Sequence, residues 1–198
     1  MIIDTSQSSP RDVYQMLSSC VIPRPIAWVT TRSAAGIINT APFSFFNIVS
    51  ADPPTVMIAV GRHAGGRKDT AQNIHETKEF GISLVTESLA AAMNTTSASF
   101  PSSVNEAERA GIRLQPGRHI ASPLVADSPV KLECTLSHWV ELGKSPTDVI
   151  FGKVILMDIN DDVLESGKIA ANKLKAIGRL GGNQYCTTAD IFELERPR

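Results

Sequence analysis

A glycine-rich loop followed by cations is the first place in this sequence where residue types and spacing suit a chemical task. Residues 61–70 read GRHAGGRKDT and nearly match the GxxxxGK[ST] loop of nucleoside triphosphatases. Arg67 holds the lysine position and Lys68 the Ser/Thr position that would bind Mg²⁺, so this enzyme class is excluded. Glycines, the cations Arg62, Arg67 and Lys68, and a helix that begins at Asp69 still suit a phosphate group. The same residues also suit a solvated hairpin loop.

A second candidate is the run 39–47, NTAPFSFFN, where small polar side chains alternate with aromatic ones beside a proline. A proline breaks regular strand pairing and leaves backbone N–H groups to face a flat, polar heterocycle. The alternative is a core strand whose phenylalanines pack and whose polar side chains bond to the backbone. The residues concerned are Pro42, Phe43, Ser44, Phe45, Phe46 and Asn47.

Two shorter polar segments are weaker candidates. Residues 93–97, MNTTS, look like a polar helix end in which Asn94 is the C-cap. Residues 178–185, GRLGGNQY, place a Gly-Gly pair between an arginine and a tyrosine, which suits either closure over a ligand or a simple turn. The four histidines lie in no HExxH or triad pattern, and neither GxSxG nor GxGxxG occurs. A hydrolase elbow and a Rossmann nicotinamide site are therefore excluded.

The composition is that of an ordinary globular protein. The 198 residues are 42% apolar and 20% charged, and 19 basic against 20 acidic residues give a net charge of −1. Nucleic-acid binding needs a clustered positive field, and a membrane helix needs about 20 consecutive apolar residues. Neither is evident, so we expect no nucleic-acid or membrane partner. The three cysteines are scattered without metal-ligand spacing, which predicts no metal site and a cytoplasmic location.

Local patterns predict a chain dominated by strands. Strands are expected over 26–31, 37–47 with an interruption at Pro42, 55–60, 80–85, 130–141 and 149–159. Helices are expected over 10–18 capped by Ser9, 69–77 capped by Asp69 or Thr70, 86–95 capped by Thr86, from Ser103–Glu106 onward, and over 168–177. Residues 112–129 are expected to form a long loop. Neighbouring strands with few helices between them favour an antiparallel barrel with helices on its rim over a doubly wound sheet.

Taken together, these segments resemble the flavin reductase-like, FMN-binding split-barrel family from about residue 23 to 185. The stretches that carry the resemblance are RPIAWVTT (24–31), APFSFFN (41–47), DPP (52–54), KDT (68–70) with Asn73-Ile74, SPV (128–130) with LEC (132–134), and RLGG (179–182) with Tyr185. Each is weak alone, and their shared order and spacing make the match specific.

The resemblance implies a fold, a cofactor and a set of contacts. The fold would be mainly β with peripheral helices, a Greek-key split β-barrel forming one domain over 1–198, with 1–20 as an N-terminal extension or helix. The chain would be a homodimer that binds FMN non-covalently near the subunit interface. Residues 42–47 would line the isoalloxazine, with Ser44 and Asn47 as polar contacts. The phosphate would be held by Lys68 and Thr70, together with Arg62 or Arg67. Near the ribityl chain or ring would lie Asn94, Thr95 and Ser97.

The implied activity is an NAD(P)H-dependent flavin reductase. Hydride would pass from C4 of the nicotinamide, a transient co-substrate, to N5 of the flavin, and no protein acid or base is required. The electrons would go to a partner oxygenase or another acceptor. Two alternatives stay open: an FMN-holding electron carrier without nicotinamide activity, and an oxidase like the related pyridoxamine-phosphate oxidases.

Overall fold

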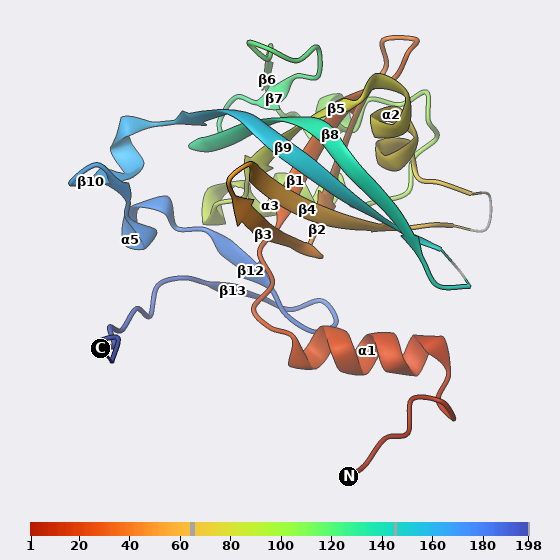
Figure 1. Ribbon diagram of the computed structural model, residues 1–198. Coiled ribbons are helices and arrows are strands. Elements are labelled where there is room, and N and C mark those ends of the chain that lie inside the picture. The colour runs from red at the N-terminus through yellow and green to blue at the C-terminus, as the bar shows by residue number, and fades with distance from the viewer. Residues whose placement is uncertain (64–65, 145, 198) are drawn as a thin grey trace.

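The protein, described by a computed structural model over residues 1–63, 66–144 and 146–197, is mainly β. Within these residues seven strands form one antiparallel sheet in the order β2-β1-β5-β8-β9-β4-β3 (Figure 1). The strands are β1 (Ala27–Arg32), β2 (Ile38–Phe43), β3 (Phe46–Ala51), β4 (Pro54–Gly61), β5 (Glu79–Leu84), β8 (Val130–Leu142) and β9 (Thr147–Ile159). The smaller ribbons are β6 (Leu114–Gln115) with β7 (Leu124–Val125), β10 (Leu164–Glu165) with β11 (Lys168–Ile169), and β12 (Ile177–Arg179) with β13 (Tyr185–Thr187). The predicted mainly β, antiparallel architecture with peripheral helices is confirmed.

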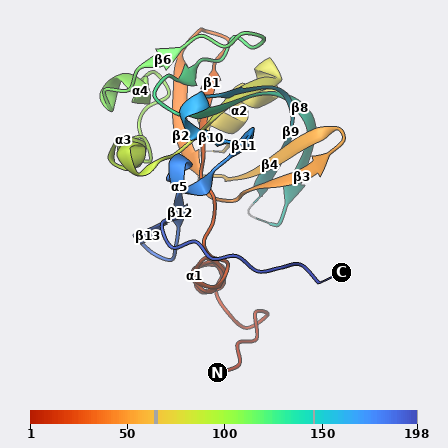
Figure 2. The same cartoon turned by 90° about the vertical axis from the view of Figure 1, so that its left-hand side faces the viewer.

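The two edge strands of the sheet are consecutive in sequence, which forces the sheet to curl. β2 ends at Phe43 and β3 begins at Phe46, so only Ser44 and Phe45 connect the two ends of the strand order. Three Cα–Cα steps span at most about 11 Å, so the two edges meet at this turn (Figure 2). We call residues 42–47 the seam. The strand interruption expected at Pro42 is wrong, since the break falls at Ser44 and Phe45. Pro42 pairs with Trp28 inside β2 and is tolerated there because β2 is an edge strand.

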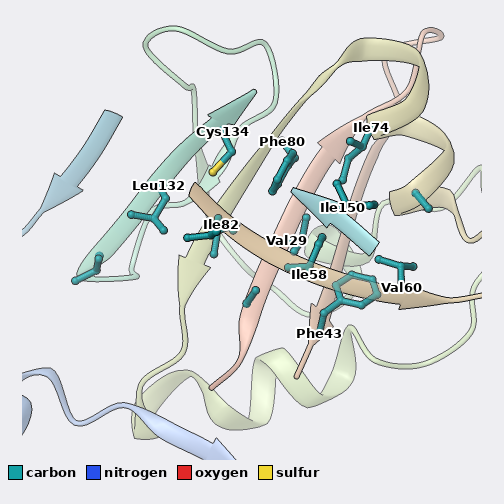
Figure 3. Packing of buried hydrophobic residues seen from close by; sticks show 14 of the residues in the cluster. Val29, Phe43, Ile58, Val60, Ile74, Phe80, Ile82, Leu132, Cys134 and Ile150 are labelled. Carbon is teal, nitrogen blue, oxygen red and sulfur yellow. The ribbon is translucent and has the colours of Figure 1, made fainter. Parts of the chain in front are cut away.

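Two hydrophobic clusters hold the sheet and position its neighbours. The larger one packs inside the curl and includes Val29, Phe43, Ile58 and Phe80 (Figure 3). The second cluster lies around fully buried Trp28, whose indole Nε1 donates to Thr96 Oγ1 at 2.9 Å. It also contains Met93 and Ile177, so it fixes a helix and a ribbon, far apart in sequence, against the same strand.

The helices lie around the sheet, and most begin near the predicted positions. They are α1 (Pro10–Cys20), α2 (Asp69–Thr77), α3 (Ala90–Thr95), α4 (Glu106–Arg109) and α5 (Ala171–Leu174), with 3-10 turns at Glu87–Leu89 and Asp161–Val163. Ser9 caps α1 as predicted, accepting from the Asp12 N–H. The expected caps of two others are wrong. Lys68 is the N-cap of α2, and Asn105, not Ser103, caps α4.

The predicted helix over 168–177 is wrong. Its first two residues form β11, a single helical turn follows as α5, and Ile177 already belongs to β12. Positive φ at Gly167 and Lys175 places a hairpin turn before α5 and ends it. Pairing of Ile177 with Thr187 then buries the isoleucine against the second cluster. Within residues 112–129, expected as loop, β6 and β7 form a short ribbon.

α1 stands apart from the sheet and lies beside the β12–β13 ribbon in both views (Figures 1 and 2). Of its eleven residues only Ser18 is buried. The turn of the ribbon approaches α1 so closely that a Cβ added at Gly181 would lie 2.7 Å from Ser19 Oγ. The space between α1, the seam and this ribbon is where the candidate site lies.

Candidate functional site

The seam divides its side chains between the core and a cavity. Phe43 is buried in the larger cluster and Phe46 packs against it, as the core-strand interpretation predicts. Pro42 and Ser44 instead line the cavity. Phe45 is 39% exposed. The segment therefore contains core side chains, as the core-strand interpretation predicts, and side chains that line a cavity, because successive strand residues face opposite sides. The contact of its backbone with a flat heterocycle stays a prediction.

The cavity has a volume of about 1020 Å³ and gathers segments from across the chain. Its walls are α1, the residues before β1, the seam, the end of α3 and the β12–β13 ribbon. This is the upper end of the size usual for small-molecule and cofactor sites. Four of the residues named from the sequence meet here: Pro42, Ser44, Asn94 and Ser97.

The end of α3 contributes polar groups to this cavity. Asn94 Oδ1 accepts from Tyr185 Oη at 3.3 Å, so its side chain connects α3 to the ribbon. Asn94 is not the C-cap of α3, which is Thr96. Ser97 Oγ donates to the Asn94 carbonyl at 2.6 Å. Thr95 does not line the cavity, and its hydroxyl donates back to Ala91 O at 3.2 Å.

Arg24 is a cavity residue to which the sequence assigned no role. It is 7% exposed, and its Nε lies 3.4 Å from Ser44 Oγ. Its Nη1 donates to the carbonyls of Ser18 and Val21 at the end of α1, and its Nη2 donates to Leu180 O at 2.9 Å. Arg24 thus ties α1 to β12, and its charge favours the negative end of the helix. Its guanidinium carbon also lies 6.0 Å from the centre of the Phe45 ring.

Arg179 supplies a second guanidinium from the ribbon. Its carbon lies 4.5 Å from the centre of the Tyr185 ring, within cation–π range. Its Nη1 donates to Tyr185 Oη and its Nη2 to the Gly182 carbonyl. The RLGG and tyrosine segment therefore forms a hairpin turn that lines the cavity. The separation of 155 residues from Arg24 to Arg179 left no local signal that the two would meet.

The described residues of the glycine-rich loop, 61–63 and 66–68, do not line the cavity. Ala64 and Gly65 of this loop lie outside the described residues. Arg62 pairs with Asp148 through two hydrogen bonds of 2.9 and 2.6 Å and with Glu141 at 2.7 Å. Arg67 pairs with Glu141 at 2.6 Å and packs on the ring of Trp139. Both arginines are thus held at the end of the β8–β9 hairpin by carboxylates.

Lys68 differs from those arginines. It is exposed, and no carboxylate of the described residues lies within ion-pair distance of it. Its Nζ lies 6.0 Å from the centre of the Phe43 ring, so it stands against the seam. It is also the N-cap of α2, and in the described chain no side chain caps that end of the helix. No side chain of the described residues therefore competes with an anion for the first N–H groups of α2.

Thr70 belongs to a buried polar chain behind this helix end. Its Oγ1 donates to Asn39 Oδ1 at 2.6 Å, and Asn39 Nδ2 donates to Glu106 Oε1 at 2.7 Å. The other Glu106 oxygen accepts from the Thr40 N–H at 2.9 Å. Thr70 is therefore engaged in positioning the start of α2. Asn47 lies on the exposed part of β3, and its Oδ1 accepts from the Ile48 N–H at 2.8 Å.

The Arg62 cluster gives a stability prediction. Burial alone would raise the pKa of Asp148, but hydrogen bonds from Arg62 and Trp139 and the charge of Arg67 outweigh it and hold this pKa below its ordinary value. Asp148→Asn is expected to lower the free energy of unfolding by about 1–3 kcal/mol at pH 7, because the arginines lose a buried partner. Urea denaturation measures this loss.

The pH dependence supplies a second readout of the same variant. A carboxyl whose pKa is lower in the folded state stabilises above its unfolded pKa of about 3.9, and this contribution disappears as pH falls through the folded value. The gap between wild type and Asp148→Asn should therefore narrow below about pH 4. Asp127→Asn, which removes an exposed pair with Arg113, should cost under about 1 kcal/mol. Equal losses in the two variants would contradict the assignment.

The described chain holds no cluster of three or more His, Cys, Asp or Glu side chains able to bind a metal. No helix in the described ranges is long and apolar enough to span a bilayer.

Comparisons with known proteins identify the family of this chain. The model of the flavin reductase like domain matches residues 17–175. An uncharacterised protein of Halalkalibacterium halodurans is 37% identical over 202 residues, covering 100% of this chain and 97% of its own. The structure of nitrilotriacetate monooxygenase component B from Bacillus cereus is 37% identical with a TM-score of 0.95, covering 98% of each chain. The 2-nitrobenzoate 2-nitroreductase of Pseudomonas fluorescens is 32% identical with a TM-score of 0.91, covering 100% of this chain and 96% of its own. The chain belongs to the flavin reductase like domain family and is a flavin-binding oxidoreductase.

Proposed function

We propose that this protein is an NAD(P)H-dependent FMN reductase. The observation that carries the proposal is the cavity at the seam. It brings together Pro42, Ser44, Asn94 and Ser97, which the family resemblance implies as flavin contacts. Membership of the flavin reductase like domain family supports the same conclusion.

The residues present fit FMN in charge and shape. The exposed Lys68 and the uncapped N-terminus of α2 suit a phosphate, while the seam offers Ser44 and aromatic edges to a flat ring. We propose that the phosphate binds at Lys68 and that the ring reaches along the seam toward the cavity. Arg62 and Arg67, whose charges are balanced by Asp148 and Glu141, would add less. Thr70 would act by positioning α2.

The chain itself has three tasks in this reaction. Bound FMN supplies the hydride acceptor at N5, and reduction by NAD(P)H with one proton from solvent yields reduced flavin and NAD(P)⁺. The seam orients the ring, and the apolar side chains around it exclude water. The positive charge of Arg24, held against the seam, favours a negatively charged ring system. A protein acid or base is not needed for hydride transfer.

A dinucleotide must bind here without a Rossmann domain, because the sequence contains no GxGxxG. Its nicotinamide would stack on the open face of the flavin, and its adenosine half would find only surface contacts. We therefore expect a KM toward about 1 mM and poor discrimination between NADH and NADPH.

Anaerobic mixing of FMN-loaded protein with NADH or NADPH tests the proposal. Bleaching of the flavin absorbance by both dinucleotides is expected, with rates that saturate only at high concentration. If neither dinucleotide bleaches the flavin while dithionite does, the reductase is refuted and an electron carrier is the better description.

The electron acceptor is proposed to be a separate oxygenase. The similar Bacillus cereus protein is component B of a monooxygenase, which supports a two-component arrangement for this chain. We also propose that the chain acts as a homodimer. Ile48 pairs with the buried Val56, so it lies on the face of the sheet that carries the core, and yet it is 76% exposed. A second copy that covers β3 would bury it.

A further inference from the structure

The cavity beside the seam is strongly biased in charge. Two arginines line it, and its described lining contains no aspartate or glutamate. The whole chain has a net charge of −1, so the excess of positive charge around the cavity is a local feature. Neither Arg24 nor Arg179 has a carboxylate within 4 Å in the described chain, whereas Arg62, Arg67 and Arg113 all do.

Both guanidiniums have N–H groups that make no hydrogen bond within the described chain. A guanidinium has five N–H groups. Arg24 uses four of them on Ser44 and on backbone carbonyls. Arg179 uses two, on Tyr185 and Gly182. Because neutral carbonyls do not cancel a formal charge, the buried Arg24 and the half-buried Arg179 both retain an attraction for an anion. The bonds to the backbone also fix both groups, which lowers the entropy cost of binding.

We propose that Arg24 and Arg179 form an oxyanion subsite for the compound that exchanges electrons with the flavin. The group recognised is a phosphate or a carboxylate, since planar guanidiniums match both. The role of this compound as the partner of the flavin rests on the proposed function, while the binding of the anion does not. The subsite is distinct from the proposed phosphate seat at Lys68, which lies against Phe43, a core side chain that does not line the cavity.

Calorimetric titration of FMN-loaded protein with inorganic diphosphate and, separately, with benzoate tests the subsite at low salt. Arg179→Gln is expected to lower the affinity for the tighter-binding of the two anions by about 10- to 100-fold, which corresponds to the loss of one charge-assisted hydrogen bond. Arg32→Gln is the matched control. It removes the same charge from the opposite end of β1, where the side chain is exposed, and should change anion binding less than about twofold. Arg179→Lys should retain part of the affinity, and its thermal melt checks that the ribbon remains folded.

The oxyanion could belong to the dinucleotide or to a carboxylate electron acceptor, and the rate of flavin reduction distinguishes these two sources. If the dinucleotide supplies it, Arg179→Gln slows flavin reduction by NADH but not by the uncharged 1-benzyl-1,4-dihydronicotinamide. If a carboxylate acceptor supplies it, both reduction rates stay unchanged and only benzoate binding falls. Either result supports the subsite.

Two results would overturn the subsite. One is anion binding that is equal in wild type, Arg179→Gln and Arg32→Gln. The other is a loss of FMN affinity in Arg179→Gln without a loss of riboflavin affinity, because the arginine would then hold the flavin phosphate. Failure of NAD(P)H to reduce the flavin would refute the proposed function alone, since the titrations do not depend on turnover.

Discussion

Lys68→Ala is expected to weaken FMN binding by about 10- to 100-fold and to leave riboflavin binding within about twofold. Lys68 is exposed, contacts the seam through Phe43 and has no carboxylate partner in the described chain, so its charge is available to a ligand. A charge-assisted bond to phosphate contributes about 1.5–3 kcal/mol. Riboflavin lacks the phosphate and cannot use it. Fluorescence titration with the two flavins measures the difference directly.

The control for this variant lies on the same helix. Lys78 follows α2 at its C-terminal end, and its Nζ donates to the His75 carbonyl. Lys78→Ala removes one positive charge at the C-terminal end of α2, where the partial negative charge of the helix disfavours a phosphate. FMN affinity should therefore change less than about twofold. Equal losses of FMN and riboflavin affinity in Lys68→Ala would instead show that Lys68 acts on the fold or on the ring, and the phosphate assignment would be wrong.

Local signals in the sequence predict the helix of the proposed phosphate seat and two long strands of the sheet. The helix over 69–77 was expected with the bounds that α2 has, and the two long strands were placed within two residues of β8 and β9. These elements are periodic and bounded by turn residues, so short-range chemistry specifies them. The cap of α2 was wrong because Asp69 and Thr70 lie inside the helix, where Thr70 bonds to Asn39. That error matters for the proposed function, since the helix end has no side-chain cap.

The region from 168 to 177 shows where local patterns fail. Its residues suit a helix, but Ile177 is recruited by the second cluster and by pairing with β13. Tertiary burial outweighs a helix preference that amounts to a few tenths of a kcal/mol per residue. The cavity could not be predicted for a related reason. Arg24, Asn94 and Arg179 approach one another only because Trp28, Met93 and Ile177 share one cluster, and that packing involves residues about 150 positions apart.

Dimer affinity should be highly sensitive to a single substitution at Ile48. Ile48→Asp is expected to raise the dimer dissociation constant by more than about 100-fold. In a two-fold symmetric interface each substitution acts twice, and burying an isoleucine contributes about 1.5–3 kcal/mol per copy. Sedimentation at several concentrations gives the constant for both proteins. The fold should tolerate the change, because Ile48 is 76% exposed within the chain. Unchanged melting of the isolated protomer checks this.

Ile169→Asp is the matched control for the dimer variant, since Ile169 is an exposed isoleucine on the β10–β11 ribbon, away from β3. It should leave the dissociation constant within about twofold. Ile48 follows the seam residue Asn47 directly, so a partner that covers β3 also shields one end of the proposed flavin site from water. FMN affinity should therefore fall together with dimerisation in Ile48→Asp and stay unchanged in Ile169→Asp. A wild-type protein that sediments as a monomer at every concentration, with FMN still bound, would refute both the interface and its link to the cofactor.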